Sequence, residues 1–279
     1  MNLDKASFYL RKGSSRVIAV LGPSDSGKTS LISSVYELFQ ISPIGDVAFV
    51  GSHTLHAFEM SCHDARSASR RSEPYTNRTP HGEVTFYHLQ VGSVSTEQHT
   101  ALLLADRAGE QYLSAASDIG VVENFLEVHR ADVLTILVDG GRLLDNGDRH
   151  NVISDTKMML QGLIDGGGLK QIKHLALCLT KTDAVSASSH QNRVLEDFDG
   201  LGEFVMRSCE TYFDKIECFH LAASPKTNGF ARGTGVSSLL SFWLGPVAAS
   251  KSDMPGNLKF NRPFTALQPI SEGLEPDNE

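Results

Sequence analysis

The sequence feature that most constrains the fold is the run GPSDSGKT at residues 22–29. It fits the pattern G-x-x-x-x-G-K-[ST], and it lies between an apolar run at residues 16–21 and a segment, residues 31–39, whose apolar side chains recur at helical spacing. Glycines in such a loop let successive backbone N–H groups point toward a phosphate, and the following helix N-terminus adds partial positive charge. The sequence therefore predicts a phosphate-binding loop, or P-loop, between a strand and a helix.

Two side chains of this loop have predicted roles that follow from phosphate chemistry. We expect Lys28 to reach the β- and γ-phosphates and the Thr29 hydroxyl to ligate Mg²⁺. The alternative is a glycine-rich turn that matches by chance, and the strand and helix on either side favour phosphate binding. The predicted phosphate-binding residues are Gly22, Ser24, Asp25, Ser26, Gly27, Lys28, Thr29 and Ser30.

Short apolar runs alternate with longer helical segments along the chain, which is typical of a mostly parallel sheet covered by helices on both faces. The connection between residues 83–91 and 101–105 is too short for a helix, so these two runs predict an antiparallel hairpin. We therefore expect an α/β, three-layer P-loop NTPase fold, with a mostly parallel sheet and one antiparallel edge strand. The predicted strands are residues 16–21, 46–50, 83–91, 101–105, 133–138, 174–179 and 217–221.

Composition excludes several classes of function. The 279 residues include 25 Lys and Arg against 33 Asp and Glu, a net charge of −8 that argues against general nucleic-acid binding. No run of 18 apolar residues occurs, which argues against a membrane span. The four cysteines show no CxxC pairing. We expect reduced thiols and a cytoplasmic protein.

A second motif follows the apolar run at residues 101–105. Asp106 opens Asp-Arg-Ala-Gly, a D-x-x-G sequence that ends at Gly109. An acid at the end of a neighbouring strand can hold the Mg²⁺ that bridges nucleotide phosphates, and the glycine N–H of such a turn can contact a γ-phosphate. The alternative is an acid that merely ends a strand. Its position after a P-loop favours the magnesium role for Asp106.

A third motif concerns the base. Thr180-Lys181-Thr182-Asp183 follows the apolar run at residues 174–179. A carboxylate just past the strand end can accept both N1–H and N2–H of guanine, a donor pair that adenine lacks. We expect Asp183 to do so, the Lys181 stem to lie along the purine face, and the Thr180 hydroxyl to brace this loop against the P-loop.

The order and spacing of these motifs resemble the Ras-like (TRAFAC-type) GTPases, and more closely the bacterial double-GTPase group, over residues 16–244. The resemblance implies GTP/GDP and Mg²⁺ as ligands and a partner protein. It also implies a place in a bacterial multi-protein system, a group of systems of which some act in defence. It also implies that Ser224 or one of its neighbours, after the last predicted strand, contacts the guanine through a backbone N–H, because Pro225 has none. For the switch threonine that ligates Mg²⁺ it favours Thr79, with Thr76 and then Thr54 as alternatives.

Five residues depart from the pattern or fill its gaps. Glu110 stands where Ras-like proteins usually carry the glutamine that orients the attacking water, so hydrolysis is in question. Gln111 and Arg78 are candidates for water orientation and for charge supplied in cis, and the alternative for both is a solvated loop residue. Ser24 and Asp25 occupy positions that are often glycine. Their side chains are expected to restrict the γ-phosphate pocket or the approach of an arginine from a partner protein.

These observations give a predicted organisation and function. We expect a lead-in at residues 1–15, a GTPase domain at 16–245 with an insertion at about 52–82, and a proline-containing acidic tail at 246–279. Residues 54–71 are a candidate helix, and residues 66–80 read as a basic loop. The predicted function is a GTP-binding switch that hydrolyses GTP slowly and controls a partner. The alternatives are a non-hydrolysing guanine-nucleotide-binding scaffold and an ATPase.

Overall fold

The structure is a computed structural model of the full chain, and it describes residues 1–2, 5–6, 14–70, 84–96, 98–227 and 229–246. By its internal contacts the chain divides into Met1–Ala248 and Ala249–Glu279, and all described residues belong to the first unit. The predicted acidic tail lies outside them. The side chains of residues 64–70, at the end of one helix, also lie outside the description.

Seven strands form one sheet in the order β2-β3-β4-β1-β5-β6-β7. Strands β4, β1, β5, β6 and β7 are parallel neighbours, whereas β3 is antiparallel to both β2 and β4. Each strand lies within two residues of its predicted bounds. The strands are β1 (Ser15–Leu21), β2 (Val47–Gly51), β3 (Thr85–Ser93), β4 (His99–Asp106), β5 (Val133–Asp139), β6 (His174–Thr180) and β7 (Lys215–His220).

The predicted mostly parallel sheet with one antiparallel strand is thus confirmed, except that this strand does not lie at the edge. That strand, β3, lies second from the edge, and β2 pairs with its outer side over Val47–Gly51. The short connection between β3 and β4 leaves only an antiparallel pairing open to them.

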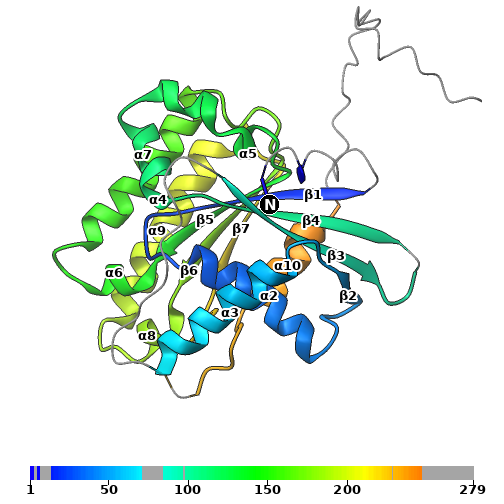
Figure 1. The fold of residues 1–279 in the computed structure, drawn as a ribbon. Coiled ribbons are helices and arrows are strands. Elements are labelled where there is room, and N and C mark those ends of the chain that lie inside the picture. The colour runs from blue at the N-terminus through cyan, green and yellow to red at the C-terminus, as the bar shows by residue number, and fades with distance from the viewer. Residues whose placement is uncertain (3–4, 7–13, 71–83, 97, 228, 247–279) are drawn as a thin grey trace, which may run out of the picture. The chain divides into compact units, whose positions relative to one another are not determined.

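Helices cover both faces of the sheet (Figure 1). The helices are α2 (Lys28–Ile41), α3 (Leu55–Arg70), α4 (Gly109–Leu113), α5 (Leu126–His129), α6 (Gly140–Leu144), α7 (Arg149–Asp165), α8 (Thr182–Ser186), α9 (Gln191–Cys209) and α10 (Val236–Leu244), with 3₁₀ turns η1 (Ser114–Ala116) and η2 (Ile119–Asn124).

Alternation along the strands divides the interior into two cores. Ile18 and Val20 of β1 pack in the core that contains α2, α3 and α10, whereas Ala19 and Leu21 pack in the core that contains α7 and α9. Successive side chains of a strand point to opposite faces, so a strand that is apolar at every position needs cover on both. The predicted three-layer architecture follows from this pattern.

The predicted loop at residues 66–80 is wrong in its first part. Residues 66–70 belong to α3, which also confirms the candidate helix at residues 54–71. Neither glycine nor proline occurs between Leu55 and Pro74, so nothing in the sequence stops the helix where its composition becomes polar. Residues 71–80 lie outside the described part of the chain.

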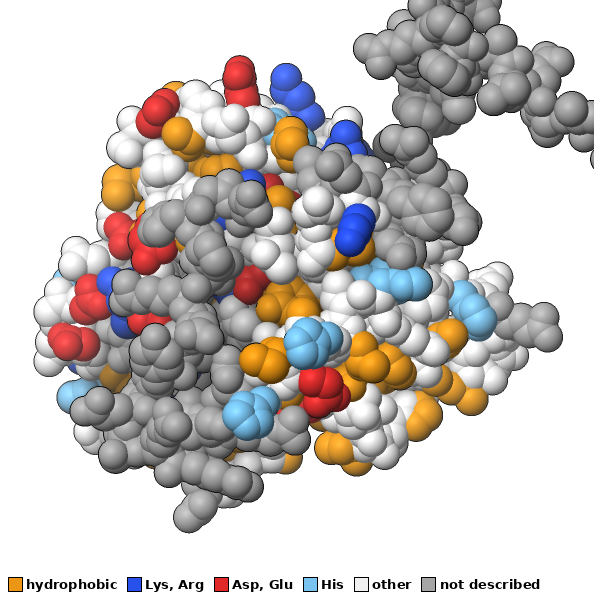
Figure 2. Space-filling model, viewed as in Figure 1, with side chains coloured by type: hydrophobic (Ala, Val, Ile, Leu, Met, Phe, Trp, Pro, Cys, Tyr) orange, Lys and Arg blue, Asp and Glu red, His pale blue; other side chains and the backbone are white. Residues whose placement is uncertain are grey.

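The surface formed by α2, α3 and β2 carries hydrophobic and histidine side chains (Figure 2). Val50, Leu55 and Met60 are about half exposed there. None of the helices in the described ranges is long and apolar enough to cross a membrane.

Candidate functional site

The three predicted motifs meet at one edge of the sheet. β1, β4, β5 and β6 run in the same direction, so their carboxyl ends bring together the P-loop, Asp106, Asp139 and the loop that begins at Thr180. In open parallel sheets this edge is where ligands bind.

The P-loop has the backbone conformations that its glycines allow. Gly27 lies in the left-handed region with φ 96° and caps α2, and Asp25 is also left-handed with φ 61°. Lys28 is 7% exposed, and its Nζ donates to the carbonyl oxygens of Gly22 at 2.9 Å and Pro23 at 2.8 Å. The lysine ammonium is therefore held inside the loop that was predicted to bind phosphate.

Burial also shifts the pKa of this lysine. Desolvation lowers the pKa of Lys28 below its ordinary value, and the carboxylates of Asp106, Glu110 and Asp25 oppose that shift. Phosphate oxygens near Nζ would oppose it further, because an opposite charge favours the ammonium form.

Thr29 and Asp106 lie in direct contact. The Thr29 hydroxyl donates to Asp106 Oδ2 at 2.8 Å, and Asp106 is 2% exposed at the end of β4. A hydroxyl and a carboxylate at this separation are the kind of oxygen ligands that Mg²⁺ prefers.

The D-x-x-G turn packs directly on the P-loop. A Cβ added at Gly109 would lie 2.4 Å from Ser24 N and 2.4 Å from the carbonyl carbon of Pro23, so only glycine fits there without a backbone shift. The next residue continues the contact, because the Ser24 hydroxyl donates to Glu110 Oε1 at 2.5 Å.

Gln111 points to a different set of residues. Its Oε1 accepts from Arg107 Nη1 at 3.4 Å, and Arg107 is in turn bound by Glu127 through Nε at 2.6 Å and Nη2 at 2.9 Å. The structure thus brings Glu110, rather than Gln111, to the P-loop.

The loop after β6 is connected to the P-loop as predicted. The Thr180 hydroxyl donates to the Ser26 carbonyl oxygen at 2.9 Å. Asp183 is 5% exposed, and its Oδ2 accepts from the backbone N–H groups of Lys226 at 2.8 Å and Thr227 at 3.3 Å. The carboxylate of Asp183 therefore links this loop to the segment after β7.

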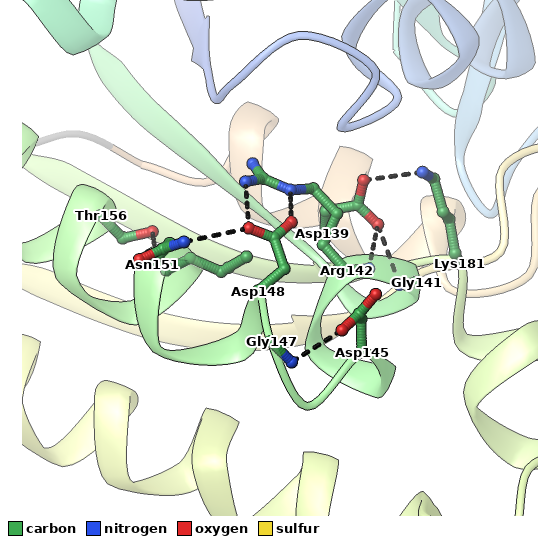
Figure 3. Close-up of polar contacts among 10 residues, drawn as sticks. Asp139, Gly141, Arg142, Asp145, Gly147, Asp148, Asn151, Thr156 and Lys181 are labelled. Carbon is green, nitrogen blue, oxygen red and sulfur yellow. Dashed lines mark hydrogen bonds and ion pairs between the residues drawn. The ribbon is translucent and has the colours of Figure 1, made fainter.

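Sequence reasoning missed one residue at this edge. Asp139 ends β5, and its Oδ2 accepts from Lys181 Nζ at 2.7 Å (Figure 3). The signal that could have revealed it is an acid at the end of an apolar strand, as at Asp106, here followed by two glycines.

Some of the remaining predicted residues lie in the described part of the chain, and others lie outside it. Ser224 is half-buried in the segment after β7, and Ser30 lies in the first turn of α2. The hydroxyl of Thr54 is hydrogen-bonded to the backbone of His88, accepting from its N–H at 2.8 Å. The residues outside the described ranges are Thr76, Arg78 and Thr79.

The fold and this edge define a P-loop nucleotide-binding protein of the GTPase type. The chain belongs to the Double-GTPase 2 family, whose sequence model matches residues 16–244. It is accordingly a GTP-binding, GTPase-like domain. No curated protein matches its sequence.

Solved structures with a similar fold include GTPases and GTPase-like domains. The signal recognition particle receptor complex SRb-GTP/SRX of Chaetomium thermophilum is 16% identical, with a TM-score of 0.46 over 83% of this chain and 96% of the other. The GTP-bound Ski7 GTPase-like domain of S. cerevisiae is 14% identical, with a TM-score of 0.43 over 89% of this chain and 54% of the other.

Proposed function

We propose that this protein is a switch that binds Mg-GTP, hydrolyses it slowly to GDP and controls a partner protein through residues 16–245. The observation that carries the proposal is the contact of Gly109 with the P-loop backbone at Ser24. A γ-phosphate held between the P-loop and the Gly109 N–H must alter that contact, whereas a diphosphate need not. We therefore expect the D-x-x-G turn to take two arrangements, with and without this contact, and the bound nucleotide to select between them.

Magnesium would be held by Thr29 and Asp106. The Thr29 hydroxyl oxygen and Asp106 Oδ2 lie 2.8 Å apart beside the P-loop, and both are hard oxygen ligands. Thr79 is the proposed third protein ligand. The ion would neutralise the charge of the β- and γ-phosphates, while Lys28 binds their oxygens.

The base would be recognised by the loop after β6. Asp183 is proposed to accept from guanine N1–H and N2–H, Lys181 to cover the purine face and the Ser224 N–H to donate to the guanine oxygen. In support, Asp183 lies within hydrogen-bond distance of the segment that follows Ser224, so the two predicted base contacts are neighbours.

The side chains beside the proposed γ-phosphate position support slow hydrolysis. Glu110 is hydrogen-bonded to the P-loop, where its charge opposes phosphate, and Gln111 is turned toward Arg107. Arg78 is the proposed source of compensating charge. The same Glu110 contact favours a second candidate function, a guanine-nucleotide-loaded scaffold that does not hydrolyse. In either form the partner is proposed to belong to a bacterial multi-protein system, with defence as one such role.

The test is calorimetric titration of nucleotide-stripped protein with GTP, GDP and ATP in Mg²⁺, followed by phosphate release. We expect guanine-selective binding and slow release. Lys28→Ala should weaken GTP binding on the order of 100-fold, because it removes charge-assisted hydrogen bonds from a buried site. Lys170→Ala, which changes an exposed lysine, is the control.

Three results would count against parts of this proposal. Equal binding of ATP would remove Asp183 from the base site. Unchanged GTP affinity in Lys28→Ala would refute the P-loop assignment. Guanine binding with no phosphate release would support the scaffold.

A further inference from the structure

The carboxylate of Asp139 joins helix α6 to the loop proposed to bind the base, and no motif assigns it a role. Its side chain is 1% exposed. Oδ1 accepts from the backbone N–H groups of Gly141 at 2.9 Å and Arg142 at 3.3 Å, and Oδ2 accepts from Lys181 Nζ at 2.7 Å (Figure 3). One oxygen thus caps the helix, and the other holds the lysine.

Two glycines after Asp139 bring α6 against this loop. A Cβ at Gly140 would lie 2.4 Å from the Thr180 carbonyl oxygen, and a Cβ at Gly141 would lie 3.2 Å from Lys181 Cδ. Because neither glycine has a side chain, the strand end at Thr180 and the stem of Lys181 can pack closely on the start of α6.

The backbone of Lys181 also fixes its direction. Lys181 has φ 55°, in the left-handed region that non-glycine residues rarely adopt. Its side chain is 41% exposed although Nζ is bound to a buried carboxylate. The lysine is therefore fixed at both ends while part of its side chain stays accessible.

We propose that Asp139 is a positioning residue for purine binding, which holds Lys181 so that its methylene stem forms one wall of the base site. This inference rests on the proposed function, and it names a residue through which that function acts. Capping α6 needs only one oxygen, so the helix alone does not account for the contact of Oδ2 with Lys181 Nζ. A buried carboxylate requires a charged or hydrogen-bonding partner, and Lys181 supplies it.

The experiment is a double-mutant cycle on GDP affinity and dissociation rate with Asp139→Asn, Lys181→Ala and the double variant. Asparagine keeps an oxygen for the α6 cap and removes the ion pair. We expect each single variant to weaken GDP binding about tenfold or more through faster dissociation, and the double variant to match Lys181→Ala within about twofold. If Asp139 acted only on the stability of α6, the losses of GDP affinity in the two single variants would multiply in the double variant.

Two further variants sharpen this test. Asp148→Asn breaks the Arg142–Asp148 ion pair, whose shortest contact is 2.5 Å, in the same region without touching Lys181, and should leave GDP affinity unchanged. If Asp139→Asn does not fold, Gly141→Ala serves instead, because its methyl group would press on Lys181 Cδ and should speed GDP dissociation.

The outcomes separate this inference from the proposed function. The positioning role of Asp139 would be overturned by unchanged GDP affinity in Asp139→Asn, or in Gly141→Ala where that variant is used. It would also be overturned if the affinity losses of the single variants multiply in the double variant. In these cases guanine binding by the wild-type protein would still support the proposed function. If the wild-type protein binds no guanine nucleotide, both proposals fail.

Discussion

The hydroxyl of Ser24 and the carboxylate of Glu110 are joined by a hydrogen bond of 2.5 Å. Ser24 is a P-loop residue, and Glu110 directly follows Gly109, whose backbone packs on the same loop. A carboxylate therefore lies beside the position proposed for the γ-phosphate, where charge repulsion opposes it.

Removal of that charge should increase turnover. We expect Glu110→Gln to raise the single-turnover rate of GTP hydrolysis on the order of tenfold, because a neutral amide in this place can orient water without repelling phosphate. Gln111→Ala should leave the rate unchanged, since Gln111 Oε1 accepts from Arg107. A slower Glu110→Gln variant would show that the carboxylate assists the reaction.

The base preference should change at Asp183. Asp183→Asn is expected to reduce GTP affinity about 10- to 100-fold, since an unsatisfied hydrogen-bonding group costs ~1–3 kcal/mol, and to raise affinity for xanthosine triphosphate. Competition between the two nucleotides measures this. Asp199→Asn, at an exposed position of α9, is the matched control. An unchanged guanine preference would contradict the role of Asp183.

The buried Arg107–Glu127 pair should stabilise the D-x-x-G turn. Glu127 is fully buried, binds Arg107 through two nitrogens and accepts from the Tyr112 hydroxyl at 3.0 Å. Glu127→Gln is expected to lower the free energy of unfolding by about 3 kcal/mol, because it leaves a buried guanidinium without a counter-charge. Urea unfolding measures this.

The control for that prediction is an exposed ion pair. Glu203→Gln removes one partner of the Arg207–Glu203 pair, whose side chains are 79% and 75% exposed, and should change stability by less than about 0.5 kcal/mol. Equal losses in the two variants would contradict the stabilising role of the buried pair.

His88 should make stability depend on pH. Burial, and then the charge of neighbouring His53, lower the pKa of His88 from 6.5 to about 4. The unfolded chain therefore takes up a proton before the folded one. The contribution of neutral His88 to stability is full above pH 6.5 and is lost as the pH falls toward 4.

The measurement is unfolding by urea at pH 7 and pH 4.5. From pH 7 to pH 4.5 we expect the free energy of unfolding of the wild type to fall by about 2–3 kcal/mol more than that of His88→Asn. Asparagine does not titrate, and its side-chain oxygen can accept from the backbone N–H of His53. His150→Asn, at an exposed position of α7, should behave as the wild type. Identical pH dependence in all three proteins would refute the assignment to His88.

Local sequence patterns predicted much of the fold, because strands and tight turns depend mainly on residues that are close together in the chain. A short apolar-rich run such as residues 174–179 has the length of a strand rather than of a helix, and the glycines at 22 and 27 allow the backbone conformations of a tight turn. The predicted loop at residues 66–70 is wrong because polar composition resembles a loop, although the sequence has no glycine or proline between Leu55 and Pro74.

The sequence by itself determined the strands, the P-loop and the order of motifs, since these depend on periodicity and on residue types that are adjacent in the chain. Only the tertiary structure decided which side chains meet: Glu110 with Ser24, Gln111 with Arg107, and Asp139 with Lys181. Such contacts join residues 4 to 86 positions apart, and they depend on strand order and helix packing. Neighbouring residues in one turn can thus point to different partners, which no local pattern encodes.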